Sequence, residues 1–340
     1  MMAPESTRMF AEAAEAPAVV QRLLDQFPDR QDLLRVLNKQ PINSVVTCGR
    51  GSSDHAATYG KYLFEILLGL PTSSAALSVT SLYDCPPHAQ GSACISISQS
   101  GRSPDLIAAA RARRDAGAIS IVLMNDPDGP LGQYSDLLLP LRAGREVSVA
   151  ATKSYIASLV ALAQLVALWS EDEALLSGLS ELPQLLERAW SLEWQYAEDT
   201  LVDARNLFVI GRGYGLGIAQ EAALKLKETC GLHAEAFSSA EVRHGPMAIV
   251  GEGFPVLGFA GSDRAGDDVR AVMAEFAQRG ARTLLIDTST DDHLPMIAAH
   301  PALEPILMIH RFYRFANSLS VRRGFDPDTP PHLNKVTKTQ

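Results

Sequence analysis

Apolar and polar positions along the chain alternate in blocks that predict strand, turn and helix in repeated succession. Residues 1–40 have helical spacing and predict a helical lead-in. The strands expected after it are short apolar runs at 45–48, 93–98, 118–124 and 137–141. The helices expected between and after them lie at about 54–68, 106–116 and 152–169. Alternation of this kind is typical of a mostly parallel sheet covered by helices, an α/β fold.

The same pattern starts again after residues 170–200, an acidic, leucine-rich stretch that predicts a connecting helix. The second series consists of a strand at 207–210, a turn at 211–217, a helix at 218–229 and further strands at 255–260 and 283–287. Near 306–309 an apolar run fits a strand or a helix, and periodicity does not separate the two.

Both series place Gly-Arg-Gly where an apolar strand turns into a helix, at Gly49–Gly51 and Gly211–Gly213. We interpret this as an internal repeat. The expected domains are a helical lead-in at 1–40, a first domain at 41–185 and a second domain with a C-terminal tail at 186–340. Ligands of such sheets bind at the carboxyl ends of the strands.

The loop at 96–105 is polar, rich in hydroxyl groups, and lies between an expected strand and an expected helix. Its small side chains let backbone N–H groups approach an anion, and the helix N-terminus adds positive potential. It has neither the lysine of a Walker loop nor the glycine spacing of a dinucleotide fingerprint. The loop therefore predicts an anion site, and the alternative is an ordinary turn capped by Ser103.

Composition narrows the possible partners. Lys and Arg number 30 against 39 Asp and Glu, a net charge of −9, and no basic block favours nucleic acid. The N-terminus lacks the pattern of a signal peptide, and the longest apolar run, 156–169, is too short to span a bilayer. We expect a cytoplasmic protein without a membrane partner. Neither the cysteines nor the histidines show metal-ligand spacing, so no metal and no cofactor are expected.

Two polar groups in the second half are candidates for chemistry. Glu221, Lys225 and Glu228 have the spacing of one helix face. A solvated row of salt bridges would have the same spacing. His244 lies in a segment dense in ionisable residues, and it fits either a functional loop or a histidine held in a turn or core.

Six short blocks, in this order and spacing, resemble the tandem sugar isomerase (SIS) domains of the glucosamine-6-phosphate synthase family. They are Gly49-Arg-Gly-Ser-Ser, Ser98-Gln-Ser-Gly-Arg-Ser, Glu146-Val-Ser-Val-Ala-Ala-Thr-Lys153, Glu221-Ala-Ala-Leu-Lys-Leu-Lys-Glu228, His233-Ala-Glu-Ala-Phe and Arg243-His-Gly-Pro. The resemblance covers about residues 8–340 and implies two SIS domains, each a flavodoxin-like sheet between two layers of helices.

The resemblance also implies site residues. The residues that would bind the phosphate and sugar are Ser52, Ser98, Gln99, Ser100, Ser103 and Val149. Glu228 would move a proton between C1 and C2 of the sugar, with Glu221 and Lys225 beside it in the catalytic group. His244 would help to open the sugar ring from the other subunit of a homodimer. Lys335 would form a Schiff base, with Lys338 as a rival and a disordered tail as the alternative.

The synthase family carries an N-terminal glutaminase domain, for which this sequence, beginning Met-Met-Ala-Pro, has no room. We therefore expect an enzyme that isomerises and deaminates glucosamine 6-phosphate to fructose 6-phosphate and ammonia. Alternatives are an isomerase or deglycase for a galactosamine or fructosamine phosphate, and a sensor that binds a phosphosugar without turnover. At 100–103 the loop departs from the synthase pattern, so the identity of the substrate sugar stays undetermined. Arg102 in this loop could contact phosphate or lie on the surface.

Overall fold

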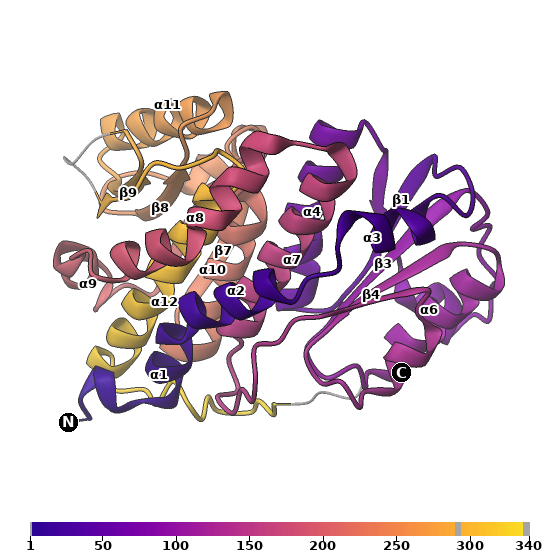
Figure 1. Cartoon of the computed structure of the whole chain (residues 1–340). Coiled ribbons are helices and arrows are strands. Elements are labelled where there is room, and N and C mark those ends of the chain that lie inside the picture. The colour runs from indigo at the N-terminus through magenta and orange to yellow at the C-terminus, as the bar shows by residue number, and fades with distance from the viewer. Residues whose placement is uncertain (1, 290–293, 336–340) are drawn as a thin grey trace. The chain divides into compact units, whose positions relative to one another are not determined.

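The computed structural model describes residues 2–289 and 294–335, which fold around two five-stranded parallel sheets (Figure 1). The strands are β1 Ser44–Cys48, β2 Thr72–Ser74, β3 Ser92–Ser98, β4 Ile119–Met124, β5 Leu137–Pro140, β6 Asn206–Gly211, β7 His233–Ser238, β8 Pro255–Ala260, β9 Arg282–Asp287 and β10 Leu294–Pro295. The α-helices are α1 Arg8–Ala14, α2 Ala16–Asp25, α3 Arg30–Leu37, α4 Ser52–Leu68, α5 Leu77–Ser81, α6 Pro104–Asp115, α7 Lys153–Ser170, α8 Glu173–Trp190, α9 Gln195–Leu201, α10 Gly215–Cys230, α11 Arg264–Gln278 and α12 Glu304–Arg322. Short 3-10 turns are η1 Pro4–Ser6, η2 Pro130–Tyr134, η3 Glu241–His244 and η4 Pro246–Ile249.

The chain divides into two compact units, each containing one sheet. The β1–β5 unit consists of Ala18–Arg145 and Ala157–Leu179. Its sheet has the order β2-β1-β3-β4-β5. The connection from β1 through α4 leads to β2 on one side of β1, whereas the connection from β3 through α6 leads to β4 in the opposite direction across the sheet. Because both crossovers are right-handed, α4 and α6 lie on opposite faces of the sheet.

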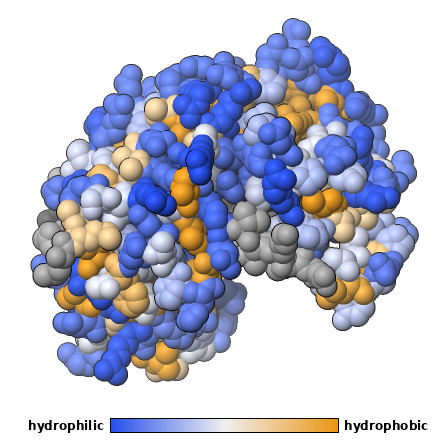
Figure 2. Space-filling view, turned by 90° about the horizontal axis from the view of Figure 1, so that it is seen from below, coloured by the Kyte–Doolittle hydropathy of each residue, from blue (hydrophilic) through white to orange (hydrophobic). Residues whose placement is uncertain are grey.

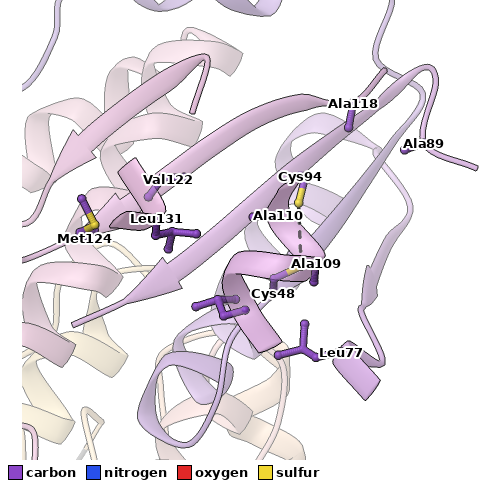
Figure 3. Close-up of a cluster of buried hydrophobic side chains, with 11 residues drawn as sticks. Cys48, Leu77, Ala89, Cys94, Ala109, Ala110, Ala118, Val122, Met124 and Leu131 are labelled. Atoms are coloured by element: carbon purple, nitrogen blue, oxygen red, sulfur yellow. Dashed lines mark hydrogen bonds between the residues drawn. The ribbon is translucent and has the colours of Figure 1, made fainter. Parts of the chain in front are cut away.

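The core on the α6 face of this sheet is made of small and medium apolar side chains (Figure 3). Cys48 from β1 and Cys94 from β3 lie inside it, with their sulfur atoms 3.8 Å apart. Both are buried free thiols, as expected for cysteines that pack in strands. The helix contributes alanines such as Ala109 and Ala110, which let α6 approach the sheet closely.

The β6–β10 unit contains residues 2–17, Glu146–Ile156 and the described part of Ser180–Lys335. Its strand order, β10-β9-β8-β6-β7, matches that of the first sheet when β6 is placed on β1. The internal repeat predicted from the two Gly-Arg-Gly turns is therefore confirmed. By the same crossover rule, α10 and α11 cover opposite faces of the sheet, and α12 packs on α10 (Figure 1).

The structure settles one ambiguity of the sequence analysis and differs from its predictions at several places. The ambiguous run near 306–309 lies inside α12, where a helix of 19 residues starts with Pro305 in its first turn, a position that suits proline. The expected single helix at 170–200 is two helices, α8 and α9. The sequence pattern does not predict the edge strands β2, β7 and β10. The strands β2 and β10 are only three and two residues long, and β7 shows neither amphipathic period.

The longest apolar run forms α7, which is long and apolar enough to cross a membrane by length and composition. However, 78% of its most apolar window is buried inside the protein, as is typical of a core helix. The face of the molecule shown in Figure 2 is mostly hydrophilic, and its hydrophobic residues form small separate groups.

Candidate active site

The hydroxyl-rich loop connects the end of β3 to the start of α6, as predicted. The N–H of Gly101 donates to Ser98 Oγ at 2.9 Å, and the N–H of Arg102 donates to Ser100 Oγ at 3.3 Å. Gly101 has φ of +64°, and a Cβ there would lie 2.5 Å from the sulfur of Met124. Ser103 is the N-cap of α6, but within the described structure its side chain makes no capping bond. The Ser103 cap that the alternative interpretation required is therefore not formed.

The second segment that is predicted to bind phosphate follows β1, which neighbours β3 in the sheet. Because the strand order reverses between these two strands, their carboxyl ends flank the crevice where ligands of such sheets bind. Ser52 is the first residue of α4, and Ser98, Gln99, Ser100 and Ser103 lie between β3 and α6. Arg50 joins the two loops, since its guanidinium donates to Asp105 Oδ2 at 2.8 and 3.0 Å. Two helix N-termini thus meet at one end of this sheet.

Arg102, which the sequence left open, is half-exposed and donates to Asp126 Oδ2 at 2.9 Å from its terminal nitrogen. Hydrogen bonds from Arg102 lower the pKa of Asp126. Arg102 is therefore engaged by a carboxylate in this structure rather than lying free on the surface.

The equivalent loop of the second repeat, between β8 and α11, is filled by the chain's own carboxylates. The N–H of Ser262 donates to Glu304 Oε2 at 2.7 Å, and the N–H of Gly266 donates to Asp263 Oδ1 at 2.9 Å. Glu304 is completely buried. Because these donors already hold carboxylates, the second loop is a poor site for another anion. In the first loop the N–H groups of Gly101 and Arg102 bond serine hydroxyl groups instead, which carry no charge.

The predicted catalytic face lies on α10 in the β6–β10 unit and is buried. Lys225 is 1% exposed, its Nζ donates to Glu228 Oε2, and it lies 3.5 Å from Glu221 Oε1. Glu221 is fully buried, whereas the side chain of Glu228 is 20% exposed. This burial excludes a solvated row of salt bridges. Of the two carboxylates, Glu228 is the one that is accessible from outside.

The charges of this cluster are set by burial and by the two carboxylates. Burial favours a neutral Lys225 amine, but Glu221 and Glu228 outweigh it and raise the pKa of Lys225, so the amine stays cationic. Tyr313 on α12 lies with its hydroxyl 3.3 Å from Glu221 Oε1. Burial, with Glu221 nearby, raises the pKa of Tyr313 well above its ordinary value, so the phenol keeps its proton and donates it to Glu221.

The segment that carries Val149 lies between Glu146 and the start of α7, and Val149 itself is half-buried. Glu146 Oε2 accepts a hydrogen bond from Lys335 Nζ at 3.0 Å. Lys335 is thus fixed and partly buried, which does not fit a disordered basic tail. Its rival Lys338 lies outside the described residues.

His244 ends the 3-10 turn η3 and is exposed in the single chain, which excludes a core histidine. Its neighbour Arg243 donates to the carbonyl of Ser239 at 3.0 Å and lies 3.7 Å from Asp268 Oδ1. Asp268 also accepts from Arg212 at 2.7 Å and from the Ser239 hydroxyl, and these bonds lower its pKa. The turn that presents His244 is therefore anchored to α11.

Three polar residues of the β6–β10 unit were not singled out from the sequence. They are Glu12, Glu146 and Tyr313. Glu146 stands at the start of a quoted block, but nothing in the pattern distinguishes it from a surface glutamate. Glu12 and Tyr313 lie in helices that read as ordinary amphipathic segments, and only tertiary packing buries their polar atoms.

The comparisons with known proteins agree with this architecture. Residues 40–168 and 200–301 match the SIS domain family. The glutamine–fructose-6-phosphate aminotransferase (isomerizing) of Methanothermobacter thermautotrophicus is 32% identical over 343 residues, which cover 98% of this chain and 57% of that protein. The chain thus spans little more than half the length of the curated relatives it matches.

Two solved structures are similar over nearly their whole length. A protein of Silicibacter pomeroyi DSS-3, presumed to be a phosphosugar isomerase, has 41% identity and a TM-score of 0.88, covering 95% of this chain and all of that one. The C-terminal domain of glucosamine-fructose-6-phosphate aminotransferase from Francisella tularensis has 26% identity and a TM-score of 0.86, covering 96% of this chain and 98% of that one. Each of the two segments that match the SIS domain family contains one of the five-stranded sheets. This chain therefore belongs to the SIS domain family and is homologous to the isomerase portion of these aminotransferases.

Proposed function

We propose that this member of a phosphosugar isomerase family isomerises and deaminates glucosamine 6-phosphate, giving fructose 6-phosphate and ammonia. The observation that carries the proposal is the buried Glu221–Lys225–Glu228 cluster, in which one accessible carboxylate is backed by a permanent cation. Titratable groups held in this way are frequent at catalytic sites. The hydroxyl-rich loop after β3, at the N-terminus of α6, supports a phosphate as the second recognition element.

In the proposed reaction, Glu228 removes the proton at C2 of the open-chain sugar and returns it at C1. The product of this transfer is an imine at C2, and water then releases ammonia and leaves the ketone. A general base must reach both carbons, and the partial exposure of Glu228 allows that contact. The ammonium group of Lys225 donates a hydrogen bond to Glu228 and so fixes the orientation of its carboxylate.

Lys335 is proposed to form a Schiff base with the C2 carbonyl, and the phosphate is proposed to bind Ser98, Gln99, Ser100, Ser103 and Ser52. Val149 would lie near the sugar hydroxyls. The exposed His244 is proposed to act on the ring form of the sugar in the site of a second copy, so the active protein would be a homodimer in the cytoplasm. Exposure of a histidine on an anchored turn supports such a role.

The proposal is tested by incubating the protein with glucosamine 6-phosphate alone and measuring ammonia and fructose 6-phosphate over time. We expect both products in equal amounts. Glu228→Gln should abolish most turnover while sugar phosphate still binds, because Gln keeps the size of Glu but cannot accept the proton. Turnover by Glu228→Gln at the wild-type rate would contradict the assigned base.

The second candidate function is the same kind of reaction on a different sugar phosphate, because the loop at 100–103 departs from the synthase pattern and Arg102 is paired with Asp126. A panel including galactosamine and fructosamine phosphates separates these substrates. A sensor that only binds phosphosugars has no use for a buried lysine between two glutamates. Binding without turnover across the whole panel would favour the sensor.

A further inference from the structure

Glu146 is a completely buried carboxylate with hydrogen bonds on both oxygens. Oε1 accepts the N–H groups of Thr152 at 3.0 Å and Ser154 at 3.1 Å. Oε2 accepts the Ser154 hydroxyl at 2.6 Å and Lys335 Nζ at 3.0 Å. Burial by itself favours a protonated carboxyl, but Lys335 and these donors outweigh burial and lower the pKa of Glu146. The carboxylate is therefore a fixed negative charge.

Its partners divide into two kinds. Three of the four hydrogen bonds come from Thr152 and Ser154, which are close in sequence and hold the carboxylate rigidly. The fourth comes from Lys335, which is 189 positions away in the sequence. Glu146 thus has its orientation set by its own loop and offers one remaining lone-pair direction to the lysine.

The segment before Lys335 has a second anchor. Asp328 accepts the N–H groups of Arg8 and Met9, each at 2.8 Å, and so fixes the segment to the start of α1. Between these two anchors Pro330 is buried, whereas residues 331–334 are exposed. Without Glu146, the Lys335 amine would therefore stand at the end of four exposed residues.

We propose that Glu146 is the positioning residue of Lys335 and holds its amine where a sugar carbonyl is bound. The inference rests on the proposed function, in which Lys335 forms the Schiff base. To form an iminium, the ammonium group first gives up a proton, and the freed lone pair attacks the ketone carbon. That proton and a second one from nitrogen leave with the ketone oxygen as one water, and nitrogen again carries the positive charge. Glu146 therefore faces a cation before and after this step, and its fixed charge suits both states. The same carboxylate also ties Lys335 to the loop that carries Val149.

The first test needs no substrate. In Glu146→Gln the side-chain volume and one acceptor oxygen remain, but the charge is lost and an NH2 group faces Lys335. Acetylation of Lys335 by acetic anhydride, followed by mass spectrometry, should become several-fold faster than in the wild type, with the exposed Lys227 as internal reference. An unchanged rate at Lys335 overturns the inference, whatever the activity of the protein.

The second test uses fructose 6-phosphate and borohydride, which reduces a Schiff base to a stable adduct. We expect the adduct at Lys335 to fall at least about tenfold in Glu146→Gln, with kcat reduced and KM nearly unchanged, because misplacing a reacting group costs rate more than binding. Glu146→Asp keeps the charge at shorter reach and should recover part of the adduct. It also replaces Glu146→Gln if that variant does not fold.

Glu12→Gln is the matched control. Glu12 is also buried and accepts N–H groups of the same loop, from Val147 and from Ser148 at 3.1 Å, but its hydrogen bonds do not involve Lys335. It should leave the adduct at Lys335 unchanged, and an equal loss in both variants would overturn the inference in favour of a general loop effect. A wild-type protein that forms no adduct would instead refute the Schiff-base step of the proposed function, and the acetylation result would still decide the contact.

Discussion

At the scale of single residues, Lys225 shows how strongly burial changes the meaning of a sequence pattern. Its partners stand four residues before it and three residues after it, which is the spacing of common surface ion pairs that contribute little to stability. In the structure Lys225 is 1% exposed, so its charge has lost water and depends on Glu221 and Glu228. Removing the cation would leave two carboxylates close together with nothing to neutralise them.

We therefore expect Lys225→Met to lower the free energy of unfolding by about 3–5 kcal/mol at pH 7, the usual cost of breaking a buried ion pair. The measurement is denaturant-induced unfolding. Lys227→Met, on the exposed face of the same helix, should change stability by no more than about 0.5 kcal/mol. Similar losses in the two variants would show that Lys225 is not the centre of a buried charge cluster.

The limits of sequence interpretation are also clearest for single residues. The loop after β3 could be predicted because its hydroxyl groups, its glycine and its place between a strand and a helix are all local features. Glu146 could not be predicted, because a carboxylate becomes a ligand of Lys335 only when two distant segments meet. The same holds for Tyr313, whose hydroxyl reaches Glu221 from another helix.

At the scale of elements, α12 shows that long-range packing settles what periodicity leaves open. An apolar run near 306–309 is compatible with strand or helix, but 19 residues that pack on α10 and α1 require a helix. His310 lies on this helix, stacks on Trp190 with ring centroids 4.9 Å apart, and has Nε2 3.1 Å from the carbonyl oxygen of Ala13 in α1. Short edge strands such as β2 carry too few residues for any comparable signal.

His310 predicts a pH dependence of stability. Burial lowers its pKa from 6.5 to about 4, so between these values the unfolded chain binds a proton that the folded protein does not. Stability must therefore fall as pH decreases, and this histidine should account for about 2–3 kcal/mol between pH 7 and pH 4.5. The variant His310→Phe can still stack on Trp190. Between pH 7 and pH 4.5 its free energy of unfolding should fall by about 2–3 kcal/mol less than that of the wild type. An equal fall in both proteins would contradict the assignment.

At the scale of the whole molecule, the two sheets share one strand order but differ in the polar groups that their loops and helices carry. The β1–β5 unit has the predicted anion loop at its switch point, where backbone N–H groups bond serine hydroxyl groups. In the β6–β10 unit, Glu304 and Asp263 take the corresponding backbone donors, and α10 carries the buried Glu221–Lys225–Glu228 cluster instead. The repeat was visible in the sequence, but this difference in use was not, because Glu304 lies far along the chain from the loop it fills.

We therefore expect one glucosamine 6-phosphate bound per chain rather than two, measured by isothermal titration calorimetry on Glu228→Gln to prevent turnover. Gly101→Ala should lose this binding, because a Cβ would lie 2.5 Å from the Met124 sulfur in a loop with positive φ. Gly69→Ala is the control, since Gly69 also has positive φ but nothing lies within 4 Å of the added Cβ. Two equivalent sites per chain would contradict the role given to Glu304.

The attachment of α1 has a practical consequence for anyone who engineers this protein. Thr7 donates to Asn317, the N–H groups of Arg8 and Met9 bind Asp328, and Glu12 holds the loop at Val147 and Ser148. A short amphipathic stretch near the start of a sequence invites trimming as a dispensable leader. Here, a shortened variant without these residues would lose the acceptor for the Val147 and Ser148 amides and the backbone donors that bind Asp328. Trimming at this end would therefore alter the surroundings of Val149 and Lys335, which lie more than a hundred positions further along the chain.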